Sequence, residues 1–148
     1  MKFVTLGLVF VVAAFGVVGS AAQGGPNLSG MWISVGPEQP MRELTVKVDG
    51  STLSLDGGPD YKATFKLDGS ETTLSAPDGK LLLVKSAWKG NTLVVTVHDP
   101  ETKQDIRRQT WAIDGDGQLM IGTEFLAPDA AMSAEKPRAP VKEVFKRR

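Results

Sequence analysis

Polar and apolar residues alternate with a period of two through most of the chain after Met31, and this alternation limits the fold more than any other feature. Leu44, Val46 and Val48 are apolar while the residues between them are polar, and the segment 61–67 repeats the pattern. Successive side chains of a strand point to opposite faces, so the pattern predicts strands with one buried and one solvated face. The expected strands are about 31–35, 43–49, 52–55, 61–67, 71–75, 80–89, 92–98, 104–113, 119–126 and 141–146.

Short turn signals separate these segments. Most of them are residue pairs that tolerate the positive φ angles of tight hairpins, so consecutive strands are expected to be antiparallel neighbours. Closing such a meander on itself removes the two exposed edges of an open sheet. We therefore predict an all-β fold, an antiparallel up-and-down meander closed into a barrel of about 8–10 strands, with a two-sheet sandwich as the alternative. The turn pairs are Asp49-Gly50, Asp56-Gly57, Asp68-Gly69, Asp78-Gly79, Gly90-Asn91 and Asp114-Gly115.

The segment from Ala127 to Pro140 departs from the alternation. It contains alanines, a methionine and a glutamate, which are good helix formers, and Asp129 can cap the first turn while Pro137 ends the last one. We therefore predict one short helix from Asp129 through Lys136, before the last strand. It could form a lid over the barrel mouth or a clasp on the surface.

Residues 1–22 have the form of an export signal. Lys2 is followed by 17 uncharged residues, Phe3–Gly19, and then by small residues before Gln23. A signal peptidase recognises this order, so we expect cleavage before Gln23. The alternative is an uncleaved membrane anchor, because a spanning helix needs about 17 to 25 residues. The expected product is a single β-barrel domain, residues 23–148, exported to a bacterial periplasm or to the extracellular space.

Charge and cysteine content exclude several classes of partner and stabilising bond. The chain has 17 basic and 17 acidic residues, a balance that offers no overall attraction to nucleic acid or anionic lipid. It has no cysteine, so disulfides and thiolate ligands are excluded and stability must come from core burial. We interpret the basic residues 146–148 as solvated end residues.

Lysines lie on the faces that are expected to point outward. An outer-membrane barrel needs an apolar exterior, so these lysines argue against one, and no membrane span is expected after cleavage of the leader. They are Lys47, Lys62, Lys66, Lys85 and Lys89.

Gly30-Met31-Trp32, at the start of the first expected strand, resembles the Gly-x-Trp signature of the lipocalins. The stretches LDGSETT, PDGK, WKGNTLVVTV and TWAIDGDGQLMI are similar to those of uncharacterised lipocalin-like proteins that bacteria export. The resemblance covers most of residues 27–148 and implies an up-and-down barrel in which Gly30 and Trp32 form a plug at one end. A tryptophan in such a strand is expected to bury its ring while its indole N–H meets a carbonyl. Arg107 and Arg108 are the two candidate partners of Trp32.

The sequence contains no recognisable catalytic constellation. His98 lies at the end of an expected strand, before a turn, and is interpreted as a solvated residue rather than a general base. Asp114-Gly115-Asp116 resembles the opening of a calcium loop, but the later positions lack the required glycine and glutamate, so we interpret it as a hairpin turn. We therefore expect no enzyme activity, no metal site and no cofactor.

The barrel interior is the remaining candidate for function. A barrel of this size either fills itself with side chains or encloses one small ligand. The inward face of the strand 104–113 carries Arg107, which indicates a wet polar mouth or an acidic ligand group, unless the side chain simply reaches water at the open end of the strand. The candidate ligand-binding residues are Tyr61, Phe65, Trp88, Arg107, Trp111 and Phe125.

Two hypotheses on function follow from this reasoning. The first is an exported lipocalin-like protein that binds a small hydrophobic or amphipathic ligand inside its barrel. The second is a non-catalytic structural or protein-interaction module of the cell envelope with a filled barrel. The packing of the interior is the feature that distinguishes the two.

Overall fold

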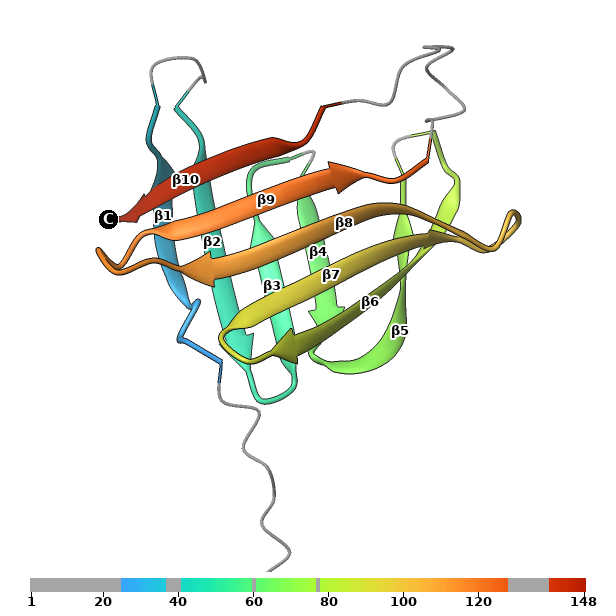
Figure 1. Ribbon diagram of the computed structural model, residues 1–148, viewed down its shortest axis with the longest axis horizontal. Coiled ribbons are helices and arrows are strands. Elements are labelled where there is room, and N and C mark those ends of the chain that lie inside the picture. Colours follow the sequence, from blue (N-terminus) through green and yellow to red (C-terminus); the bar gives the residue numbers. More distant parts are fainter. Residues whose placement is uncertain (1–24, 37–40, 60, 77, 128–138) are drawn as a thin grey trace, which may run out of the picture.

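The chain folds as one curled antiparallel sheet. The computed structural model describes residues 25–36, 41–59, 61–76, 78–127 and 139–148, and these residues form ten strands (Figure 1). The strands are β1 (Gly30–Ser34), β2 (Glu43–Asp49), β3 (Thr52–Asp56), β4 (Lys62–Lys66), β5 (Asp68–Ser75), β6 (Leu81–Lys89), β7 (Thr92–Asp99), β8 (Gln104–Ile113), β9 (Leu119–Phe125) and β10 (Val141–Arg147). The ten strands expected from the alternation are thus confirmed, and the largest shift is the earlier start of β5.

Two expected segments lie outside the described residues. They are the export signal, 1–22, and the short helix, 129–136. The part of the chain that the structure describes contains no helix, and accordingly none that is long and apolar enough to cross a bilayer.

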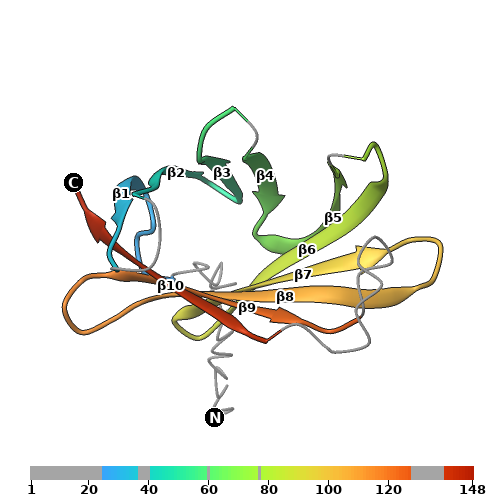
Figure 2. The same cartoon turned by 90° about the horizontal axis from the view of Figure 1, so that it is seen from above.

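The strand order makes the sheet a nearly closed barrel. The order is β4-β3-β2-β1-β10-β9-β8-β7-β6-β5, so the first and last strands pair in the middle of the sheet. Trp32 of β1 lies opposite Arg147 of β10 in this pairing. Seen from above, the sheet curls until its two ends approach each other (Figure 2). The barrel prediction is confirmed, and a sandwich of two separate sheets is not what forms.

The barrel remains open between β4 and β5. We expected all consecutive strands to pair, but in the described part of the chain no ladder joins β4 to β5, which form the two ends of the sheet. A single residue, Leu67, connects them, and the Asp68-Gly69 pair belongs to β5 instead of forming a hairpin turn. Its pairing with β6 is irregular between Asp68 and Glu71. The chain therefore passes from β4 to β5 without a hydrogen-bonded ladder between the two strands.

Alternation along each strand separates a buried interior from a charged exterior. In β7, for example, Leu93, Val95 and Val97 are buried, while the residues between them are partly exposed. The five lysines expected on the outside are all exposed. Leu67, on the apolar face of the expected strand 61–67, is buried, and the core also contains three apolar residues that the strand pattern did not single out. They are Leu28, Leu55 and Phe145.

The two ends of the barrel differ. Because the strands run alternately up and down, the β2–β3, β6–β7 and β8–β9 turns share one end, which we call the closed end. Residues 25–29 cross it: Gly25 packs against the ring of Trp88 on β6, and Ser29 Oγ accepts the backbone N–H of Val48 on β2 at 2.9 Å. Leu28 between them is fully buried. The opposite end, with the β3–β4, β5–β6 and β7–β8 turns, is called the open end.

An ion pair at the open end makes stability depend on pH. Lys80 Nζ lies 2.7 Å from Asp99 Oδ2, and Asp99 Oδ1 also accepts the backbone N–H of Glu101. The hydrogen bond from Lys80, followed by that from Glu101, lowers the pKa of Asp99 from 3.8 to about 2. A carboxyl whose folded pKa is depressed stabilises the fold above its unfolded pKa, and this contribution disappears as the pH falls towards the folded pKa.

We therefore predict that Asp99→Asn lowers the melting temperature near pH 7 and that the difference from the unmodified protein shrinks between about pH 4 and pH 2. Thermal unfolding followed by circular dichroism over that pH range would measure the difference. A difference that stays constant down to pH 2 would contradict the role given to Asp99.

Candidate functional site

Trp32 lies at the closed end with its ring fully buried. Its Nε1–H donates to the carbonyl oxygen of Leu28 at 2.9 Å, and the guanidinium of Arg147 lies 4.6 Å from the ring centroid. Gly30 has a φ of 150°, and a Cβ there would lie 3.2 Å from Arg147 Nη1. The glycine thus leaves the space that the arginine occupies.

The arginine that contacts Trp32 differs from both sequence candidates. Arg107 and Arg108 lie on β8, whereas Arg147 is brought to Trp32 by the β1–β10 pairing. Arg147 is exposed, as expected for the basic residues 146–148, but it also makes contacts that the sequence did not indicate. It donates to the carbonyl oxygens of Ser29 at 2.9 Å and Asn27 at 3.2 Å, which holds the N-terminal segment across the closed end.

We predict that Arg147→Ala lowers the free energy of unfolding by about 1–2 kcal/mol, because it removes two hydrogen bonds and a cation–π contact. Arg148→Ala is the matched control. Arg148 pairs with Glu43 on the surface, so its loss should cost less than about 0.5 kcal/mol. Urea denaturation measures both free energies of unfolding. Equal losses of stability in the two variants would contradict the role of Arg147 in holding the N-terminal segment across the closed end.

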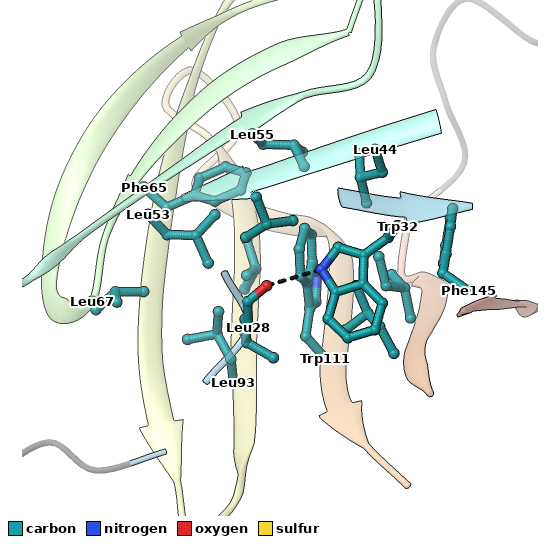
Figure 3. Packing of buried hydrophobic residues seen from close by; sticks show 14 of the residues in the cluster. Leu28, Trp32, Leu44, Leu53, Leu55, Phe65, Leu67, Leu93, Trp111 and Phe145 are labelled. Carbon is teal, nitrogen blue, oxygen red and sulfur yellow. Dashed lines mark hydrogen bonds between the residues drawn. The ribbon is translucent and has the colours of Figure 1, made fainter. Parts of the chain in front are cut away.

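Apolar side chains fill the interior next to Trp32. We call Leu53, Phe65, Leu93 and Trp111 the floor cluster; each is at most 5% exposed (Figure 3). Phe65 of β4 and Trp111 of β8 come from opposite walls, and their rings meet edge to face with centroids 6.4 Å apart. Because Trp111 has no accessible surface, no space for a water molecule remains against it. This half of the barrel is filled.

A polar layer lies on the inner wall between the floor cluster and the open end. We define it as Thr72, Ser86, Arg107, Gln109 and Thr123, which belong to β5, β6, β8 and β9. Gln109 connects this layer to the floor: its Oε1 accepts Trp111 Nε1–H at 3.4 Å, and its Nε2 donates to Thr123 Oγ1 at 3.2 Å. The orientation of the Gln109 amide is therefore determined from both sides.

Three atoms of the polar layer are buried without a hydrogen-bond partner among the described residues. They are Thr72 Oγ1, Ser86 Oγ and Arg107 Nε. Ser86 is only 1% exposed. Buried polar atoms in proteins almost always have a partner, either a protein group or a bound molecule. All three atoms can donate a hydrogen bond, so the layer is suited to a group that accepts several.

Arg107 brings an uncompensated positive charge to this layer. It lies between Val97 and Phe125 in the register and points inward, as Gln109 does. It has neither an ion pair nor a hydrogen bond with any described residue. Its neighbour Arg108 points outward, and its Nη1 lies 3.7 Å from a carboxylate oxygen of Glu124.

Two carboxylates near the open end have cations of their own. Arg42 Nη1 donates to Glu143 Oε1 at 2.6 Å on the β2–β10 side of the mouth, and Lys80 neutralises Asp99. Neither acid is therefore available to Arg107. The open half of the barrel combines a cation, several hydroxyl donors and apolar walls, which is the chemistry that holds an amphipathic molecule with an acceptor or anionic end.

The structure brings together two pairs of the ligand-binding candidates. Phe65 and Trp111 contact each other within the floor cluster. Arg107 and Phe125 are opposite each other on β8 and β9, at the level of the polar layer. The first pair therefore lies below the second along the barrel axis.

The other two candidates lie at opposite ends of the barrel. Tyr61 is at the open end, where Arg42 lies 5.2 Å from its ring centroid. Trp88 is at the closed end beside Gly25. Trp88 is opposite Leu93 of the floor cluster and therefore lies at the level of that cluster, below the polar layer.

Gln109 shares the inward face of β8 with Arg107, as the alternation predicts. Sequence reasoning missed three members of the polar layer: Thr72, Ser86 and Thr123. A signal was present, because each is a polar residue at an inward position of its strand. Ser86, for instance, lies between Val84 and Trp88 in the inward series of β6.

Two other polar sites lie away from this layer. His98 was expected to be merely solvated, yet its Nδ1 lies 3.0 Å from Asp105 Oδ1 on the neighbouring strand. Asp114 is part of a turn, as expected: its Oδ1 accepts the backbone N–H groups of Asp116 at 2.9 Å and Gln118 at 2.8 Å.

The outer wall carries two shallow hollows. One, of about 570 Å³, lies over β8, β9 and β10 around Ala112, Met120 and Gly122. The other, of about 410 Å³, lies over β5 to β8 around Ala87 and Val94. Small side chains create both hollows, and neither is lined by the unpartnered atoms of the polar layer.

Comparison with known proteins gives a fold neighbour but no sequence family. No family model and no curated protein matches the chain. Among solved structures, "REP1-NXSQ fatty acid transporter" is similar, with a TM-score of 0.59 and 14% identity over 81% of this chain and 95% of that one. A point mutant of the same transporter has a TM-score of 0.57 and 15% identity, covering 81% and 97%. This likeness shows the fold: an antiparallel barrel that these transporter structures share.

Proposed function

We propose that the protein binds a small amphipathic molecule in the open half of its barrel. The observation that carries the proposal is the set of buried donors without partners at Thr72, Ser86 and Arg107. A carboxylate or another anionic acceptor placed there would satisfy them, while Phe125 and the neighbouring apolar wall would cover the rest of the molecule. The fold neighbour that is named for fatty acids supports a ligand of this general kind.

The remaining parts of the proposal come from the sequence. We propose that residues 1–22 direct export and that the barrel acts in a periplasm or outside the cell. We further propose a non-catalytic role, because the polar layer, as far as the structure describes it, contains no histidine or carboxylate that could act as a general base.

A filled structural module is the second candidate, and the floor cluster favours it. Phe65 and Trp111 meet across the barrel, so this half has no room for a ligand. If only water molecules contact the polar layer, the barrel would serve only as a scaffold. The two candidates differ in whether a small molecule binds to the polar layer.

Titration with octanoate, octanol and octylamine tests the proposal. These probes share an apolar chain and differ in the charge of the head group. Saturable binding measured by calorimetry, strongest for octanoate, is the expected result, with a change in tryptophan emission because Gln109 links the polar layer to Trp111. Absence of binding by all three probes would favour the filled module. Preference for octylamine would contradict the cationic site.

A further inference from the structure

The outer-wall hollow over β5 to β8 is bordered by positive charge. Its volume is about 410 Å³, and Lys85, Lys89 and Arg108 line it, whereas none of the described residues around it is acidic. The whole chain has as many acidic as basic residues, so this concentration of positive charge is local. The hollow lies outside the barrel and is independent of the function proposed for the interior.

Strand pairing places five outward side chains of this wall in one row. Thr96 on β7 lies opposite Lys85 on one side and Arg108 on the other. Glu71 lies beyond Lys85, and Glu124 lies beyond Arg108. The two acids are thus at the ends of the row, and the two cations flank the Thr96 hydroxyl. The Cα atoms of the two cations are two strand spacings apart, roughly 10 Å.

The acids at the ends of the row neutralise the cations only weakly. Lys85 Nζ lies 3.2 Å from Glu71 Oε1, and both side chains are at least 48% exposed. Arg108 Nη1 lies 3.7 Å from Glu124 Oε2, again with both side chains well exposed. Exposed ion pairs contribute little free energy, so an anion that approaches the middle of the row can compete for both cations. Lys89, at the end of β6, has no ion pair with any described residue.

Small side chains beside the row leave room for a ligand. Ala87 and Val94 are opposite each other on β6 and β7, and both line the hollow. β5 contributes Gly69, whose φ is 82° and which lies where the β5–β6 pairing is irregular. A Cβ at Gly69 would meet no atom within 4 Å, so this side of the hollow is open. A group of the size of phosphate can therefore approach Thr96 from outside.

We propose that this hollow binds a phosphate group, held by Lys85 and Arg108 with the Thr96 hydroxyl as a further donor. Lysine and arginine both form charge-assisted hydrogen bonds with phosphate, and a dianion between them gains from two positive charges at once. Lys89 adds a third positive charge at the edge of the hollow. A carboxylate carries a single charge and gains less here, which distinguishes this site from the one proposed inside the barrel.

Titration with inorganic phosphate tests the site. Two-dimensional NMR should show saturable shifts of the backbone amide signals of Ala87, Val94 and Thr96. Added sodium chloride should weaken the binding, because salt screens exposed charges.

Charge variants test the role given to the two cations. Lys85→Met and Arg108→Met should each weaken phosphate binding by about fivefold, the loss of one charged contact at an exposed site. Lys47→Met is the matched control, because Lys47 is an exposed lysine on β2 that does not line the hollow. It should leave the affinity for phosphate unchanged.

Flotation with lipid vesicles distinguishes a dissolved phosphate compound from a lipid head group. Vesicles that contain phosphatidic acid present a phosphate monoester, whereas pure phosphatidylcholine vesicles do not. Binding to the phosphatidic acid vesicles alone, reduced in Lys85→Met and Arg108→Met, would assign the site to a lipid head group. Binding of inorganic phosphate without binding of either vesicle would assign it to a dissolved compound.

Two results would overturn the proposal. One is the absence of saturable phosphate-induced shifts at the hollow together with the absence of binding to phosphatidic acid vesicles. The other is an equal loss of phosphate affinity in Lys47→Met and Lys85→Met, which would mean that total charge alone attracts the anion. Neither result bears on binding inside the barrel.

Discussion

Replacing Trp32 by alanine is expected to lower the free energy of unfolding by about 3–5 kcal/mol, a cost typical of truncating a buried tryptophan. The ring has no accessible surface, so its removal leaves a cavity at the closed end. The change also leaves the Leu28 carbonyl without its indole donor and Arg147 without the ring it stacks against. Because residues 25–29 are held by these same contacts, the closed end should loosen together with the core.

Urea denaturation of Trp32→Ala, Trp32→Phe and Trp88→Ala would test this prediction. Trp32→Phe keeps an aromatic ring but loses the N–H donor, so its loss of stability should lie between that of Trp32→Ala and zero. Trp88→Ala is the control at the same end, and its effect should be smaller because Trp88 is only partly buried. A loss for Trp32→Ala that does not exceed that for Trp88→Ala would mean that the closed end does not depend on the plug.

Replacing Arg107 by methionine is expected to reduce the affinity for octanoate by about tenfold to a hundredfold, the range for a lost hydrogen bond to a charged group. Affinity for octanol should change little, because the neutral head group gains less from the cation. Stability should stay equal or rise, since methionine removes a buried donor that has no partner among the described residues. Loss of binding without loss of stability distinguishes a binding role from a structural one.

Arg108→Met is the matched control for Arg107→Met. Arg108 is the next residue on β8, but it points outward towards Glu124. The control makes the same chemical change on the same strand without touching the interior. Equal losses of octanoate affinity in the two variants would show that general charge, not the inward position of Arg107, attracts the ligand.

The strands could be predicted from the sequence because each depends on local alternation. The segment 92–98, for example, alternates so regularly that its buried face follows directly from side-chain geometry, and β7 has that face. The β4–β5 opening could not be predicted in this way. Asp68-Gly69 has the composition of a hairpin turn, and only the curvature of the whole sheet decides that it begins β5 instead.

The contacts between distant parts of the chain could not be predicted from the sequence either. Arg147 reaches Trp32 only because β1 pairs with β10, a contact between residues at opposite ends of the domain. Leu28 precedes the first strand and is buried because residues 25–29 pass across the closed end. Arg107, by contrast, was identified correctly as an inward arginine, because its position relative to Trp111 on one strand determines its face.

A crystal structure with bound 8-bromooctanoate would test the binding site most directly, because anomalous scattering locates the bromine atom. We expect the carboxylate at Arg107, within hydrogen-bond distance of its guanidinium, and the bromine inside the barrel on the open side of the Phe65–Trp111 contact. Bromine found only on the outer wall, in crystals of a protein that binds the probe in solution, would contradict it.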